Sequence, residues 1–241
     1  QGVSSAASDV YKRQTFTNAG TFNKTGTGTQ TVDINLTNTG VVNVTTGVFA
    51  ATGTTFTQTG KIDVASGTTF QRIGGFTNTG FLQGQGTVDV GTGNTLLNNG
   101  TIRPSLTGGT GLGTLAINGN LTEGPSGIIQ LDIAGTSAGQ YDVLAISGTG
   151  TFSGSVVQLA DISGGTLPAV VSAAMITCGT CVGPFTGLNS NDLTFSTTFN
   201  PSNVTFNVLG LINRWILNGS GAWEMAANWS RGVVPNSSQD V

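Results

Sequence analysis

Histidine is absent from this 241-residue chain, and charged residues make up only 8% of it. Without histidine, catalysis of the Ser–His–Asp type is excluded. The net charge of −3 gives no reason to expect nucleic acid or an anionic membrane as a partner. The apolar stretch at residues 167–177 is too short for a membrane span and contains Pro168, so no transmembrane segment is expected. Glycine, threonine, asparagine and serine dominate, and residues that favour helices are scarce.

A phrase that ends in glycine repeats through residues 15–114 at a spacing of twenty. An apolar residue stands four positions before each glycine, and another stands two positions after it. A fixed period of this length is typical of a solenoid, in which each repeat stacks on its neighbour. The glycines of the repeat are Gly20, Gly40, Gly60, Gly80 and Gly100.

The residue types of the repeat predict strands rather than helices. Thr, Val, Phe and Ile stand at alternate positions between Gly and Asn, which is the pattern of short strands broken by turns. Helical repeats usually need thirty or more residues. The prediction is therefore an all-β fold, a right-handed parallel β-helix with about 20 residues per coil.

Three columns of the repeat are expected to have defined roles. The column Phe16, Leu36, Phe56, Phe76 and Leu96 should point inward, as should Phe22, Val42, Ile62, Leu82 and Ile102. Amides stacked in register bind one another from coil to coil, so an internal ladder is predicted for Asn18, Asn38, Gln58, Asn78 and Asn98. The alternative is that these amides lie exposed in turns. Asn and Gly both tolerate the left-handed backbone that a sharp turn needs, which is the expected reason for the turn glycines.

The chain divides into four parts by its pattern. Residues 15–114 hold the regular repeats, and residues 115–210 read as less regular coils with a closing cap. Residues 1–14 lie outside the pattern and resemble the conceptual translation of a sequencing adapter, so they are set aside as non-native. Residues 211–241 bring the only tryptophans, Trp215, Trp223 and Trp229, and are interpreted as the truncated start of a further unit.

Residues 113–122, 131–144 and 148–154 carry phrases of the type G-x-L-x-I-x-G-N-L, A-G-Q-Y-D and G-T-x-x-G. In these phrases the chain resembles bacterial autotransporter passengers and related large surface adhesins, and the tryptophan phrase resembles the opening of a unit in giant bacterial surface proteins. A departure is that residues 167–176 replace the strand usual in that family. The resemblance implies an extracellular, cell-surface location, and partners among host-surface or matrix glycans and proteins, with self-association as another possibility.

Cys178 and Cys181 form a C-x-x-C motif with several readings. An extracellular protein favours a local disulfide that pins a turn. Free thiols, a redox pair and a metal site are the alternatives, although a zinc site would need two further ligands. No cofactor, metal site or catalytic residue is assigned.

Three functions compete. The first is a structural and adhesive segment, a stiff rod that presents loops, chiefly beyond Thr107, for attachment. The second is a carbohydrate-active β-helix enzyme or a carbohydrate-binding module, for which the sequence offers the pair Lys61 and Asp63, Arg103 about two coils further, and the tryptophans. The third is an ice-binding solenoid, which needs paired ranks of threonine, whereas Thr37, Thr57 and Thr77 align singly. The first is preferred.

Overall fold

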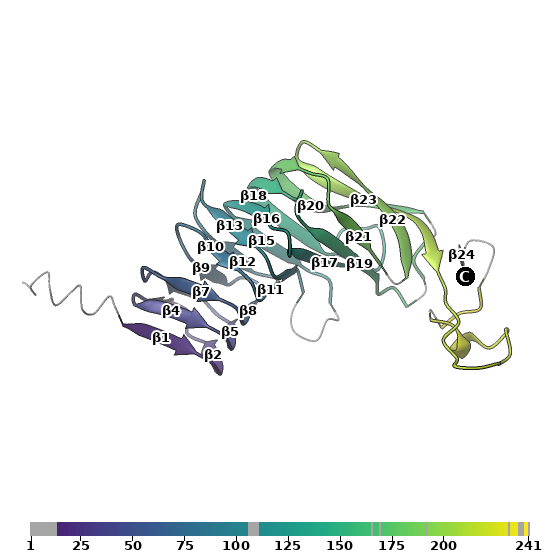
Figure 1. Cartoon of the computed structure of the whole chain (residues 1–241), viewed down its shortest axis with the longest axis horizontal. Helices are drawn as coiled ribbons and strands as arrows, with labels where there is room; N and C mark the ends of the chain where they lie inside the picture. The colour runs from purple at the N-terminus through teal and green to yellow at the C-terminus, as the bar shows by residue number, and fades with distance from the viewer. Residues whose placement is uncertain are drawn as a thin grey trace, which may run out of the picture.

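The repeats wind into coils of three short strands, and each strand pairs in parallel with its counterpart in the next coil (Figure 1). The computed structural model describes residues 14–105, 111–164, 166–168, 170–190, 192–230, 232–235 and 239–240. Residues 1–13 of the segment that resembles an adapter, and most of the period-breaking loop after Arg103, lie outside the described residues. The predicted all-β parallel β-helix is confirmed.

The strands form three ladders along the rod. The first ladder contains β1 (Thr15–Asn18), β4 (Asn35–Asn38), β7 (Phe56–Gln58), β10 (Phe76–Asn78), β13 (Thr95–Asn98) and β16 (Asn120–Glu123). The second contains β2 (Thr21–Lys24), β5 (Val41–Val44), β8 (Lys61–Val64), β11 (Phe81–Gly84), β14 (Thr101–Arg103), β17 (Ile128–Ile133), β19 (Val156–Asp161) and β21 (Gly187–Asn189). The third contains β3 (Thr29–Val32), β6 (Val48–Ala51), β9 (Thr69–Gln71), β12 (Thr87–Asp89), β15 (Thr114–Asn118) and β18 (Val143–Thr151).

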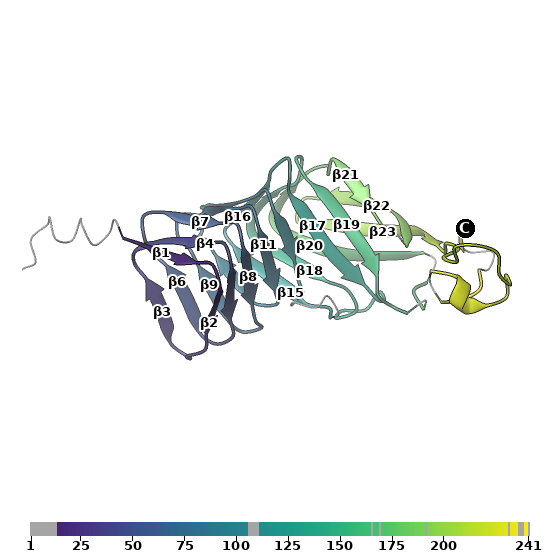
Figure 2. The ribbon, with the colours of Figure 1, turned by 60° about the horizontal axis from the view of Figure 1, so that its bottom comes forward.

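The C-terminal part of the rod changes from coils to a hairpin (Figure 2). The long strand β18 pairs with both β15 and β16 and so joins the first and third ladders. β20 (Val171–Val182) pairs in parallel with β18 and antiparallel with β23 (Asn203–Ile212), which also pairs with β22 (Leu193–Asn200). Beyond β23 come a 3-10 helix, η1 (Ala226–Asn228), and β24 (Gln239–Asp240).

Apolar side chains from all three ladders fill the interior. Both predicted inward columns are in the core, with Leu36, Leu82 and Ile102 essentially unexposed and Phe16, Phe22 and Phe56 partly buried. The third ladder adds a stack that the sequence analysis did not identify: Phe49, Phe70, Val88 and Ile117. Burying one side chain of this size contributes roughly 1.5–3 kcal/mol to the free energy of folding. Successive coils are therefore held together by a continuous apolar core.

The repeat glycines lie at the corner between the first and second ladders, but the predicted reason for them is wrong. None of Gly20, Gly40, Gly60, Gly80 and Gly100 has a positive φ, and neither does any described residue other than glycine. The coils instead approach too closely for a side chain. A Cβ on Gly80 would lie 1.9 Å from the carbonyl oxygen of Gly60, and one on Gly40 would lie 2.1 Å from that of Gly20.

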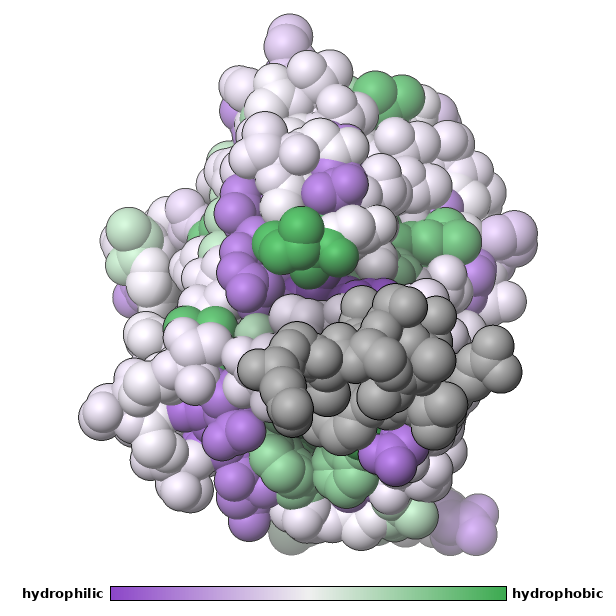
Figure 3. All heavy atoms as spheres, turned by 90° about the vertical axis from the view of Figure 1, so that its left-hand side faces the viewer, coloured by the Kyte–Doolittle hydropathy of each residue, from purple (hydrophilic) through white to green (hydrophobic). Residues whose placement is uncertain are grey.

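The first coil has features of a protected edge. β1, β2 and β3 pair with one neighbouring strand each among the described residues. Lys24 takes the inward position that Val44 holds in the next coil, and its buried ammonium donates to the carbonyl oxygens of Gly26 and Thr46. The end view in Figure 3 shows apolar side chains in small separate groups among polar ones. An inward-pointing charge is one means by which natural sheets discourage edge pairing.

Alanine substitutions at two corner glycines test the close-approach explanation. Gly80→Ala should destabilise the chain by about 1–3 kcal/mol or more, because the new methyl group meets the backbone of the preceding coil. Gly20→Ala is the matched control, since no described atom lies within 4 Å of its Cβ. Urea unfolding followed by circular dichroism measures both. Equal unfolding midpoints for the two variants would contradict the explanation.

Candidate binding groove

A column of polar side chains points outward along the whole second ladder. Strand pairing aligns Asn23 with Asn43, Asn43 with Asp63, and Asp63 with Gln83, and so on through β21. Two amide pairs in this column bind each other directly, with Asn43 Nδ2 2.8 Å from Asn23 Oδ1 and Gln130 Nε2 2.8 Å from Gln158 Oε1. The full column is Asn23, Asn43, Asp63, Gln83, Arg103, Gln130, Gln158 and Asn189.

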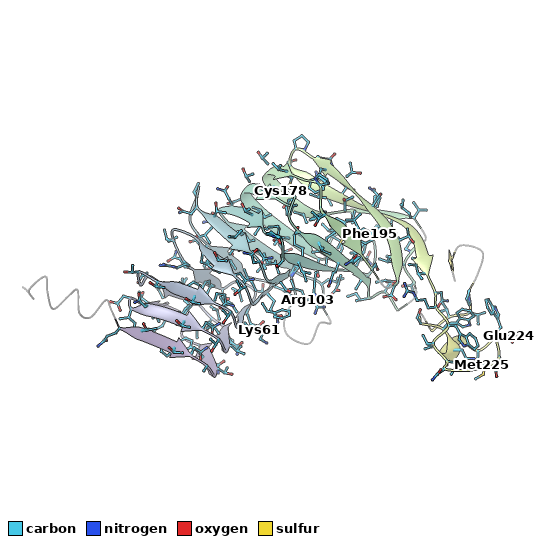
Figure 4. All side chains as sticks on the ribbon, in the orientation of Figure 1. Lys61, Arg103, Cys178, Phe195, Glu224 and Met225 are labelled. Carbon is cyan, nitrogen blue, oxygen red and sulfur yellow. A yellow bond between two sulfur atoms is a disulfide. The ribbon has the colours of Figure 1, made fainter. Side chains whose placement is uncertain are left out.

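The C-terminal half of this column forms a groove of about 600 Å³ over β14, β17, β19 and β21. Arg103 lies on the same side of the rod as Lys61, near its lower margin in Figure 4. The volume is in the range of known small-ligand sites. Its polar lining consists of Arg103, Gln130, Asp132, Gln158, Asn189, Ser190 and Asp192.

The charges at the floor of the groove are paired. Arg103 Nη2 lies 2.9 Å from Asp132 Oδ2, and the Asp132 side chain is only 5% exposed. Behind this pair, the two carboxyl oxygens of Asp142 accept hydrogen bonds from the backbone N–H groups of Gly113 and Asp132. Burial raises the pKa of Asp142 to about 7, although these two hydrogen bonds oppose the shift. Asp142 therefore ties the segment just before β15 to strand β17 and positions Asp132.

The hydrogen-bonding capacity that the groove still offers a ligand is in its amides and in the hydroxyl group of Ser190. A glutamine side chain offers both donors and an acceptor, and the Gln130–Gln158 hydrogen bond uses only one donor and one acceptor. Arg103 and Asp132 neutralise each other at the floor. This chemistry suits an uncharged ligand with many hydroxyl groups, lying along the rod and meeting one polar rank per coil.

The structure places the other pair considered for catalysis outside this groove. Lys61 Nζ lies 3.0 Å from Asp63 Oδ2. Asp63, Gln83 and Arg103 follow one another in the outward column, so Arg103 is two coils from Asp63. The two side chains are 25% and 11% exposed, so this is a partly buried ion pair within the column.

The predicted amide column lies inside the rod. Asn18 Nδ2 is 2.8 Å from Asn38 Oδ1, Asn38 Nδ2 is 2.8 Å from Gln58 Oε1, and Asn78 Nδ2 is 2.8 Å from Asn98 Oδ1. Gln58 donates to the carbonyl oxygen of Gly60 at 2.8 Å, so the chain of amides runs in two segments. Apart from Asn18, at 6% exposure, these side chains are essentially unexposed.

Glu123 ends this internal ladder, and the sequence analysis missed it. Its Oε2 accepts a hydrogen bond of 2.9 Å from Asn98 Nδ2, twenty-five positions away rather than twenty. Glu123 is 3% exposed, and its Oε1 has no hydrogen-bond partner among the described residues. Burial raises the pKa of Glu123 to about 8, while the Asn98 hydrogen bond acts in the opposite direction. Glu123 is thus mostly protonated at neutral pH, and its uncharged carboxyl group extends the ladder of neutral amides.

Cys178 and Cys181 form a disulfide. It lies within strand β20, rather than in the turn that the sequence analysis expected. The pairing of β18 with β20 shifts register between Ile146 and Thr149, opposite this bond. Cys178 belongs to the core and Cys181 packs against it, so the disulfide stabilises an irregular point of the sheet.

The tryptophans form a small cluster on the C-terminal segment. Trp229 is 3% exposed, and the rings of Trp215 and Trp223 meet it edge-on at centroid distances of 5.2 and 4.3 Å. Figure 4 labels Glu224 and Met225 at the far end of this segment. Trp223 is 50% exposed. Packing therefore accounts for Trp229, while one face of Trp223 remains open to solvent.

Comparison with known proteins finds no protein family that matches the chain and no curated protein that matches it. Across the described ranges, no three His, Cys, Asp or Glu side chains gather in a way that would hold a metal ion. No helix in the same ranges is long and apolar enough to cross a membrane.

The raised pKa of Glu123 predicts how stability changes with pH. The folded chain keeps this proton up to about pH 8, whereas the unfolded chain releases it near pH 4.5. The free energy of unfolding should therefore fall as pH rises through this window, by up to about 1.4 kcal/mol per pH unit. Glu123→Gln should flatten the curve and exceed the wild type in stability at pH 9. Urea unfolding from pH 4 to 9 measures this effect. The exposed Glu224→Gln is the control, and a Glu123→Gln curve that follows the wild type would contradict the prediction.

Proposed function

We propose that the chain is a structural and adhesive segment of a secreted bacterial surface protein, in which the β-helical rod presents the groove for attachment. The observation that carries this proposal is the unbroken second ladder, whose outward side chains form one polar column that ends in the groove. Continuous coil-to-coil hydrogen bonding and a continuous apolar axis make a rod that resists bending.

Two further observations support a place outside the cell. The chain contains a disulfide, and disulfides persist in oxidising compartments. Its surface relies on hydroxyl and amide groups for solubility, since charged residues are only 8% of the chain. Sequencing the parent gene on both sides tests the location. An export signal upstream and an anchor or membrane barrel downstream would agree with it, whereas a complete gene with neither would contradict it.

The groove favours a glycan as the attached partner. Its amides and its hydroxyl match the hydroxyl groups of a sugar chain, and the paired Arg103 and Asp132 leave little net charge to select a strongly ionic ligand. Ranks repeat every coil, at about 4.8 Å, a distance comparable with the length of one sugar unit. The proposed ligand is a neutral oligosaccharide of a few units, since Asp192 adds a negative charge to the lining beyond the Arg103–Asp132 pair.

Enzymatic cleavage of such a glycan is the competing function. The same groove contains Asp132 and Asp192, and paired carboxylates are the usual means of glycoside hydrolysis. The hydrogen bonds around Asp132 and Asp142 favour binding over catalysis, because the Arg103 pair and two backbone N–H groups occupy their oxygens. Release of reducing ends or unsaturated products from polysaccharides by the purified chain would replace the adhesive proposal with an enzymatic one.

A glycan array probed with the purified chain tests the binding proposal. Gln130→Ala should weaken binding to the selected glycan by up to about tenfold, the value of one or two hydrogen bonds. Asn43→Ala is the matched control, because it removes an amide from the same column and breaks the same kind of amide pair outside the groove. The proposal fails if no glycan binds, or if the two substitutions weaken binding equally.

A further inference from the structure

Threonines cover the outward side of the first ladder at its N-terminal end, on β1, β4, β7 and β10. Strand pairing places Thr17 beside Thr37 and Thr37 beside Thr57, and Thr77 takes the next place because Gln58 pairs with Asn78. All of these threonines are exposed except Thr37, which is half-buried. We call this set the threonine face: Thr15, Thr17, Thr37, Thr39, Thr55, Thr57, Thr59, Thr77 and Thr79.

A second column of threonines, which the sequence analysis did not expect, lies beside the first at the corner that follows β4, β7 and β10. The second column consists of Thr39, Thr59 and Thr79, each two residues after a threonine of the first column. Their hydroxyls all donate to the corresponding carbonyl oxygen of the preceding coil, at 3.3, 3.3 and 2.9 Å. Because the same bond recurs in these three successive coils, the hydroxyl and methyl groups of this column point the same way along the rod.

The threonine face differs from the groove side in charge. Its outward positions carry Thr, Asn, Ala or Gly and no charged residue, whereas the second ladder carries Lys61, Asp63 and Arg103. The guanidinium of Arg72 lies at the border, where it donates to the carbonyl oxygens of Ala51 and Thr54. A surface without charge lacks the ionic groups that would bind a mineral, a lipid headgroup or nucleic acid.

The threonine face is regular along the rod. Its ranks repeat at about 4.8 Å, and the second column stands at the corner, one residue beyond the ends of β4, β7 and β10. Threonine is stiff at χ1, and the buried amides Asn38 and Gln58 brace the strands from within. A rigid, uncharged array of hydroxyl and methyl groups, repeated along the rod in two adjacent columns, fits a ligand that is itself periodic and rich in hydrogen-bonding groups, as ordered water is at the surface of hexagonal ice.

We infer that the threonine face binds ice, by ordering water between its methyl and hydroxyl groups into the pattern of the crystal surface. This inference is independent of the proposed glycan groove, which lies on the other ladder and mainly in later coils. A rod with both surfaces would bind a glycan through the groove and ice through the threonine face.

Thermal hysteresis and ice-crystal shape, measured with the purified chain, test the inference. The chain should produce a freezing-point gap and faceted crystals, and Thr57→Lys should remove most of that gap, because a long cation at the centre of the face breaks the ordered water. Thr57→Ser, which keeps the hydroxyl and loses one methyl, should reduce the gap partially.

Thr69→Lys is the matched control, since Thr69 lies in the same coil and points outward from the third ladder. Circular dichroism and melting curves establish that each variant is folded. Rounded crystals without hysteresis from the wild-type chain would overturn the inference. An equal loss in Thr69→Lys, or no loss in a folded Thr57→Lys, would overturn it as well, because ice would then contact another surface or none.

Discussion

The close contact between successive corners is the constraint on which the rest of the rod depends. The carbonyl oxygens of Gly20, Gly40, Gly60 and Gly80 each accept a hydrogen bond of 2.7–2.8 Å from the first residue of the following coil's second-ladder strand. The next glycine of the column passes so near the same oxygen that a methyl group would not fit. This contact fixes the register of each coil against the last, and a shift of one residue would exchange every inward and outward side chain.

Once the register is fixed, the alternation of side chains along each strand divides the molecule into columns. The inward columns supply the apolar axis and the amide ladder, so the outward columns can vary without loss of the fold. The first ladder uses this freedom for uncharged threonine and the second for amides and ions. Two surfaces of different chemistry therefore lie side by side along the same rod, joined by a corner at which Gly40, Gly60, Gly80 and Gly100 leave no room for a side chain.

The strict period explains which features could be predicted from sequence. The first and second ladders repeat at twenty residues through Gly100, so their inward columns and the amide column were identified correctly. The third ladder pairs Thr29 with Val48 and Val48 with Thr69, at intervals that differ by two residues, and this slippage concealed the stack of Phe49 and Phe70. Glu123 was missed because its coil is longer. The groove was missed because it needs neighbours such as Gln130 and Gln158, which are twenty-eight residues apart.

The change from regular to longer coils is also where buried carboxyl groups gather. Glu123 ends the amide ladder, and Asp142 ties Gly113 to strand β17 behind Arg103 and Asp132. A buried carboxyl is costly unless it is neutral or well paired, and burial raises the pKa of both groups. In the regular coils the internal ladder consists of neutral amides instead. The longer coils therefore contain both the groove and a junction whose free energy of unfolding falls as pH rises. Local opening of the rod should begin at this junction rather than among the coils that carry the threonine face.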